Sequence, residues 1–167
     1  NLQDHLQLRM AFKVRNVLTL NKLANSWVGK AKMALQYALF RSGPLTMAPS
    51  QLGGFTRSSA SYGTPNIEYH VQPLTLDKFG DPLHPFPAFT ASVCNLRPTS
   101  RGHVRIRSAD FRDAPEIQPN YLATPEDHQV AIDSLRLTRK IAQAPALARY
   151  TPDEFLPGPK VQSDAEL

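Results

Sequence analysis

The chain has 167 residues, of which 41% are hydrophobic and 20% are charged, and this balance predicts one folded domain and excludes a disordered chain. Its 19 Lys and Arg against 14 Asp and Glu give a net charge of +5. The basic residues are scattered, without a block of five or six like charges, which argues against a nucleic-acid-binding surface.

The number of cysteines and the hydropathy of the sequence exclude further classes of protein. Cys94 is the only cysteine, so the chain forms no internal disulfide and no CxxC metal site, and we expect no metal and a cytoplasmic location. No apolar run approaches the ~20 residues of a membrane-spanning helix, so no membrane span is expected. The chain begins at Asn1 rather than at a methionine, and we expect it to be a piece of a longer protein.

The first predicted element is helical. Apolar residues recur at a helical period over residues 20–42, and we expect two shorter helices separated near Ser26 or Gly29. Gly43 followed by Pro44 is typical of a helix end. The small and polar residues that follow, 46–64, predict a loop with one short strand at Phe55 to Arg57.

A strand is predicted for Asn66 to Pro73, because apolar and polar residues alternate there. One face would carry apolar side chains, and the other would carry Asn66, Glu68, His70 and Gln72. The proline-rich stretch that follows, 77–87, predicts an irregular excursion over the surface.

Two further strands are expected as a hairpin. Phe89 to Leu96 forms the first, and Val104 and Ile106 alternate with basic residues in the second, His103 to Ser108. We expect Val104 and Ile106 to pack under the long helix described next. Arg105 and Arg107 would then form an outer face and pair with Asp110 or Asp113.

The last long element is a helix with a well-marked start. Thr124, Pro125 and Asp127 form a capping signature, and an apolar stripe continues to Ala142. The proline-rich remainder after Ala144 predicts no further core strand. These elements together predict an α+β fold, in which an antiparallel β-sheet has helices packed on one face.

Few residues stand out as candidates for a catalytic or binding role. The sequence contains no GxGxxG, GxxxxGK[ST], GxSxG or HExxH motif. A lone histidine is usually structural, but His70 shares its strand face with Glu68 and Gln72, and such a face can line a pocket. The alternative is that this face simply meets water.

Four stretches resemble one family over essentially the whole chain. They are "NLQDHL" (1–6), "RSGPLT" (41–46), "GGFTR" (53–57) and "RPTSRGHVRIRSADFRDAPEIQPNYL" (97–122). They are similar to the glucose–methanol–choline oxidoreductases, and in particular to the choline and alcohol dehydrogenase branch.

The resemblance implies that residues 1–167 are the substrate-binding domain of a flavoprotein, truncated at both ends, in which hydride passes from an alcohol to FAD. Residues 1–6 would be the remnant of an FAD-contacting segment, with Asn1, Asp4 and His5 as cofactor-binding residues. The FAD-binding domain would precede them, and the catalytic histidine would follow the last residue. No catalytic residue and no bound FAD are therefore expected in this chain alone.

The expected partners are a small alcohol and the missing FAD-binding domain. The substrate-binding candidates are Phe55, Glu68, His70 and Gln72, and the loops around Phe55 and over residues 77–87 come next. Choline would need a carboxylate or an aromatic cage for its quaternary ammonium, which Glu68, Tyr69 and Phe55 could supply. A free-standing basic α+β module that binds an anionic partner is the alternative.

Overall fold

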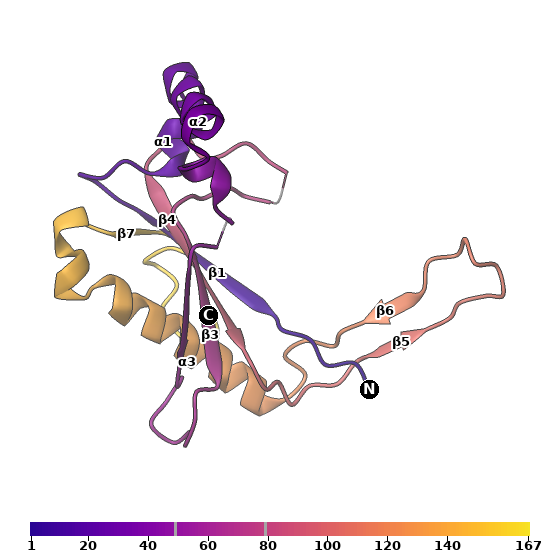
Figure 1. The fold of residues 1–167 in the computed structure, drawn as a ribbon. Coiled ribbons are helices and arrows are strands. Elements are labelled where there is room, and N and C mark those ends of the chain that lie inside the picture. The colour runs from indigo at the N-terminus through magenta and orange to yellow at the C-terminus, as the bar shows by residue number, and fades with distance from the viewer. Residues whose placement is uncertain (49, 79) are drawn as a thin grey trace.

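A computed structural model describes residues 1–48, 50–78 and 80–167. Pro49 and Phe79, which fall inside two stretches predicted as irregular, lie outside the described residues. The main body is one five-stranded antiparallel sheet in the order β2-β3-β4-β1-β7 (Figure 1). Its strands are β1 (Gln7–Lys13), β2 (Leu52–Thr56), β3 (Ile67–Gln72), β4 (Ala88–Asn95) and β7 (Asp153–Leu156). β3 and β4 confirm two predicted strands, and β2 extends the predicted short strand toward Leu52.

The helix α3 (Pro125–Ala142) covers one face of this sheet, which confirms the predicted α+β class (Figure 1). Its start is as predicted, because the Thr124 hydroxyl accepts a hydrogen bond from the Asp127 amide at 3.3 Å. The buried side chains of α3 pack on two groups of strand residues, which together form the core. These core residues are Met10, Phe12, Ile67, Tyr69, Ala91, Val93, Val130, Leu135 and Ala142.

The helices α1 (Leu20–Ala24) and α2 (Trp27–Phe40) confirm the predicted break. Ser26 caps α2 by accepting a hydrogen bond from the Gly29 amide at 3.3 Å. Gly29 is required here, because a Cβ would lie 2.2 Å from the Leu23 carbonyl oxygen. The pair lies beyond one end of the strands, whereas α3 lies across the face of the sheet (Figure 1). The predicted apolar stripe of α2 is therefore exposed at Trp27 and Leu39.

The interior strand β1, which lies between β4 and β7, was not predicted. Met10, Ala11 and Phe12 are at most 3% exposed: Met10 and Phe12 pack with α3 on one face, and Ala11 lies near Thr75 and Leu76 on the other. A strand buried on both faces shows no alternation of apolar and polar residues. After Ala144, where no further core strand was predicted, the short strand β7 pairs with β1 and forms one edge of the sheet. The remaining elements of the body are two short 3₁₀ helices, Pro44–Thr46 and Pro145–Tyr150.

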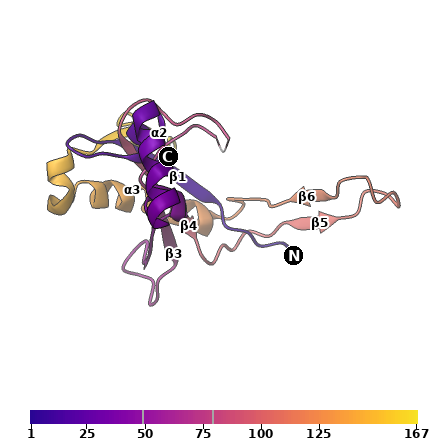
Figure 2. The same cartoon turned by 45° about the horizontal axis from the view of Figure 1, so that its top comes forward.

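The predicted hairpin between β4 and residues 103–108 is wrong. β5 (His103–Arg105) pairs with β6 (Glu116–Gln118), and the two form a separate ribbon that extends away from the body in both views (Figures 1 and 2). Val104 and Ile106 are 55% and 89% exposed, so they do not pack under α3. The alternation in this segment marks a two-stranded ribbon rather than a strand of the main sheet.

The predicted partners of Arg105 and Arg107 also differ. Asp110 pairs with Arg112 at 2.7 Å, and Asp113 accepts a hydrogen bond from Ser108 at 2.5 Å. Both acidic residues therefore bond to residues of the turn between β5 and β6 rather than to Arg105 or Arg107. Among the described helices, none is both long and apolar enough to cross a membrane.

Candidate functional site

The polar candidates lie on the sheet face opposite α3. Residues directly opposed in neighbouring antiparallel strands point to the same side. Phe55, Glu68 and Cys94 form one such row across β2, β3 and β4, and His70 lies in the next row beside Ser92. The alternate residues, such as Tyr69, point toward α3 and the core.

Glu68 and His70 form the polar centre of this face. The Nε2 atom of His70 lies 3.4 Å from Oε1 of Glu68, and the two side chains are 31% and 21% exposed. An imidazole can donate or accept a hydrogen bond with an alcohol, and a carboxylate can accept one or attract a cation. The pair therefore offers placed polar groups in a partly sheltered position, as a small-molecule site requires.

The structure separates the four substrate-binding candidates. Glu68 and His70 lie together, and Phe55 lies opposite Glu68 and is 63% exposed. Gln72 is only 7% exposed, and its amide donates to the Ser50 hydroxyl at 3.1 Å. Gln72 therefore has a structural partner within the chain, whereas the other three surround an accessible part of the face.

Cys94 is a residue of this face that the sequence did not single out. It lies opposite Glu68, is 2% exposed and has a free thiol. Burial raises the pKa of the Cys94 thiol, and the charge of Glu68 adds to this rise. Only the pairing register places Cys94 beside Glu68, and the register is not visible in the sequence.

The predicted excursion after β3 covers one end of the same face. The Thr90 hydroxyl donates to the Leu74 carbonyl at 2.8 Å, and the amide of Asn21 donates to the carbonyls of Thr75 and His84 at 2.9 and 2.8 Å. These bonds hold the excursion against the sheet and α1. The excursion after β3 thus covers one end of the polar face and leaves the rest of that face uncovered by it.

The three cofactor-binding candidates lie in the exposed N-terminal segment. The Asp4 carboxylate accepts a hydrogen bond from the Tyr121 hydroxyl, which lowers the pKa of Asp4. The Nε2 atom of His5 lies 3.2 Å from the Leu96 carbonyl oxygen, and Asn1 is exposed. Asp4 and His5 thus have partners within the chain, and a role of the three residues in binding FAD stays a prediction.

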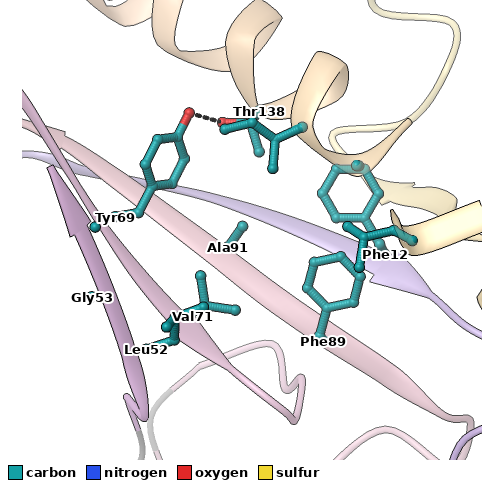
Figure 3. A pocket seen from close by; sticks show the side chains of 12 residues that line it. Phe12, Leu52, Gly53, Tyr69, Val71, Phe89, Ala91 and Thr138 are labelled. Atoms are coloured by element: carbon teal, nitrogen blue, oxygen red, sulfur yellow. Dashed lines mark hydrogen bonds between the residues drawn. The ribbon is translucent and has the colours of Figure 1, made fainter. Parts of the chain in front are cut away.

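A larger cavity lies on the other side of the sheet, between the strands and α3 (Figure 3). It has a volume of about 380 Å³ and an almost wholly apolar wall that includes Phe12, Val71 and Phe89. Its two hydroxyl groups bond to each other, with Tyr69 Oη 2.9 Å from Thr138 Oγ1. Burial raises the pKa of Tyr69, so its phenol stays neutral. This cavity can hold an apolar group but offers no acid–base pair.

Several known proteins are similar to this chain. It is 36% identical over 167 residues to the oxygen-dependent choline dehydrogenase of Serratia proteamaculans, and 36% identical over 168 residues to an alcohol dehydrogenase [acceptor] of Pseudomonas putida. Each match covers 100% of this chain and 30% of the relative, so the chain spans about a third of the relatives' length.

Solved structures share the fold. A formate oxidase of Aspergillus oryzae matches 98% of this chain with a TM-score of 0.82 and 19% identity, and the match covers 33% of that protein. Pyridoxine 4-oxidase from Mesorbium loti matches 98% of this chain with a TM-score of 0.72 and 24% identity, over 28% of its own length. These likenesses support the α+β fold described above.

A family match completes the comparison. Residues 98–167, which include the ribbon, α3 and β7, match the C-terminal part of the family described as GMC oxidoreductase. Together with relatives matched over the whole chain, this favours part of an oxidoreductase over a free-standing basic module. The match assigns residues 98–167 to the C-terminal part of the glucose–methanol–choline (GMC) oxidoreductases, and the chain as a whole is similar to choline and alcohol dehydrogenases over about 30% of their length.

Proposed function

We propose that this region binds the alcohol substrate of an FAD-dependent dehydrogenase or oxidase on the sheet face opposite α3. The observation that carries the proposal is the Glu68–His70 pair, whose side chains lie 3.4 Å apart and are only partly exposed. A small alcohol needs a few fixed polar groups, and a strand in the middle of a sheet holds its side chains rigidly.

The site also suggests the class of alcohol. Glu68 lies directly opposite Phe55 in the β2–β3 pairing, so a carboxylate and an aromatic ring stand side by side. A quaternary ammonium group is attracted by both. We infer a preference for choline-like alcohols, and the choline dehydrogenase relatives agree with this inference.

The cofactor belongs to another part of the intact enzyme in this proposal. Members of the family bind FAD, and when bound it accepts the hydride from the alcohol. The present chain has no GxGxxG turn for the pyrophosphate. Its role is to bind and orient the alcohol, with a cytoplasmic location for the whole protein.

The ribbon is the proposed contact with the FAD-binding domain. Its apolar side chains Ile106 and Phe111 are 89% and 94% exposed, and Val104 and Ile117 are 55% and 60% exposed. The N-terminal segment lies at its base, since Leu2 and Gly102 exchange backbone hydrogen bonds of 2.9 and 2.8 Å. The N-terminal segment, which the resemblance assigns to FAD contact, therefore lies at the base of the ribbon that carries these apolar side chains.

The test uses the intact flavoenzyme with Glu68→Gln and His70→Gln. The attraction between a carboxylate and a quaternary ammonium about 4 Å away is about 1 kcal/mol in water and about 4 kcal/mol at an effective dielectric constant of about 20, so we expect KM for choline to rise about tenfold or more in Glu68→Gln. An uncharged alcohol of similar size should be affected less. Flavin content and Tm should stay unchanged in both variants.

The control is Asp164→Asn, which makes the same carboxylate-to-amide change at an exposed residue paired with Arg136. It should leave KM and kcat unchanged. Unaltered kinetics in both Glu68→Gln and His70→Gln would contradict the proposed site.

A further inference from the structure

Three donor groups of different chemistry meet on the polar sheet face. They are the Glu68 carboxylate and the His70 imidazole on β3, and the Cys94 thiol on β4. One donor atom from each lies within 4.8 Å of the other two. Strand pairing places them, because Glu68 is opposite Cys94 and His70 is two residues further along the same strand. The cluster is therefore fixed by the sheet rather than by loops.

The donor set matches a borderline-soft divalent cation. Zn²⁺ is bound in proteins by cysteine sulfur, histidine nitrogen and carboxylate oxygen. Bonds of about 2.0–2.3 Å in a tetrahedron separate the donor atoms by roughly 3.4–3.7 Å. The Glu68 and His70 donors are already 3.4 Å apart, and all three donors lie within 4.8 Å of one another, so side-chain rotations that move a donor by roughly 1 Å are enough to reach this spacing. Ca²⁺ and Mg²⁺ prefer oxygen donors alone and do not fit this set.

Two other histidines provide a comparison within the molecule. His84 lies 3.2 Å from Asp77, and His103 lies 3.2 Å from Glu116. In the parts of the chain that the structure describes, only the Glu68–His70 pair is joined by a third donor. The third donor, Cys94, is 2% exposed, so the cluster is closed toward the sheet and open only on the side of Glu68 and His70.

We propose that Glu68, His70 and Cys94 form a binding site for one Zn²⁺ or a similar thiophilic divalent cation. The cation replaces the proton of the Cys94 thiol and takes three protein ligands, which leaves a fourth position open. Such an open site binds metal reversibly. If the proposed function holds, the cation and the alcohol occupy the same face, and the metal is a competitive inhibitor of the intact enzyme.

The cation site is tested directly on the 167-residue chain, without flavin or alcohol. The chain is titrated with Co²⁺, whose bond to a thiolate gives a charge-transfer band in the near ultraviolet and whose tetrahedral sites absorb strongly in the visible. We expect saturation at one equivalent and loss of both signals when Zn²⁺ is added. Circular dichroism verifies that each variant is folded.

Variants identify the ligands. Cys94→Ser and Cys94→Ala should both abolish the charge-transfer band, so a folding defect in one of them does not remove the test. His70→Gln and Glu68→Gln should each weaken Co²⁺ binding at least about tenfold, because even outer-shell partners change metal affinity by 10–100-fold. The matched control His103→Gln should bind Co²⁺ like the unchanged chain.

Either of two results would overturn the site: no charge-transfer band in the unchanged chain, or equal weakening by His103→Gln and His70→Gln. These outcomes are separate from a failure of the proposed function. Alcohol kinetics of the intact enzyme can depend on Glu68 and His70 whether or not the chain binds Co²⁺. Competition between Zn²⁺ and the alcohol is measured last, on the intact enzyme.

Discussion

Asp127 is the buried carboxylate that fixes the start of α3. It is 4% exposed and accepts hydrogen bonds from the backbone amides of Thr99 and Ser100 at 2.9 and 2.8 Å, and from the Asn95 side chain at 3.2 Å. It also lies in the first turn, where the helix dipole favours a negative charge. One side chain thus joins the end of β4, the base of the ribbon and α3.

The protonation of Asp127 links stability to pH. Burial opposes its charged form, but the hydrogen bonds from Ser100 and Thr99 outweigh burial and lower the pKa of the carboxyl. A lowered pKa means that the stabilisation is fully present above the unfolded pKa of about 3.9 and is lost as the pH falls through the folded pKa.

We predict that Asp127→Asn lowers the free energy of unfolding by about 2 kcal/mol at neutral pH. The difference from the unchanged chain should shrink below about pH 4. Denaturant unfolding at neutral and acidic pH measures both. Asp133→Asn, which changes a less buried carboxylate on the same helix, is the control and should have a much smaller effect. Equal losses in the two variants would count against this role of Asp127.

The polar site shows what alternation can reveal at the level of single residues. Glu68 and His70 are recognisable in the sequence because polar residues recur at every second position of β3. Gln72 fits the same pattern but is bonded to Ser50, which comes from a distant loop. Cys94 joins the site through a strand pairing. Whether Gln72 and Cys94 belong to the site depends on residues that are distant in the sequence. A local alternation pattern carries no information about such distant partners.

At the level of elements, a bidentate ion pair joins α3 to the edge strand β7. The guanidinium of Arg139 donates to both oxygens of Glu154 at 2.8 Å and to the Val161 carbonyl at 2.7 Å. The two side chains are 13% and 11% exposed. Removal of one partner would leave the other charge largely buried and unpaired.

We predict that Arg139→Met lowers the free energy of unfolding by about 3 kcal/mol, and that Arg139→Met combined with Glu154→Leu recovers part of the loss. Denaturant unfolding measures both. Arg112→Met is the control, since Arg112 forms an exposed pair with Asp110, and it should not change the unfolding midpoint. An unfolding midpoint for Arg139→Met equal to that of the control would show that the Arg139–Glu154 ion pair does not stabilise the chain.

A second prediction at the level of elements concerns the apolar side chains of the β5–β6 ribbon. Ile106→Ser with Phe111→Ser removes apolar side chains that are 89% and 94% exposed, so Tm of the 167-residue chain should stay unchanged. In the intact enzyme the same change should lower the flavin content, because the proposed contact with the FAD-binding domain is weakened. Absorbance of the flavin relative to protein measures this. Full flavin content in the double variant would place that contact elsewhere.

The elements differ in how far the sequence predicts them. The bounds of α3 follow from local signals, namely the Thr124 cap, Pro125 and the apolar stripe. β7 lies between prolines and is only four residues long, so no periodicity marks it. β5 shows the alternation of a strand, but alternation does not specify the partner. Gly102 at its start lies so close to the Gln118 carbonyl that a Cβ would be 1.9 Å from its oxygen, and this approach commits the segment to β6.

At the level of the whole molecule, the proposed function assigns alcohol binding to this chain and FAD binding to another part of the intact enzyme. We predict that the purified 167-residue chain is colourless in the visible and does not oxidise choline with an artificial electron acceptor. Absorbance after incubation with FAD, followed by gel filtration, measures retention. A stoichiometric yellow complex would show that the exposed segment with Asn1, Asp4 and His5 is sufficient to hold FAD.

The central claim is that the alcohol binds on the sheet face opposite α3. The most direct measurement is a crystal structure of the intact flavoenzyme with an unreactive choline analogue. The account predicts the analogue within hydrogen-bond or ion-pair distance of Glu68 and His70, next to Phe55. An analogue bound instead in the apolar cavity between the sheet and α3, beside Phe12 and Val71, would contradict it.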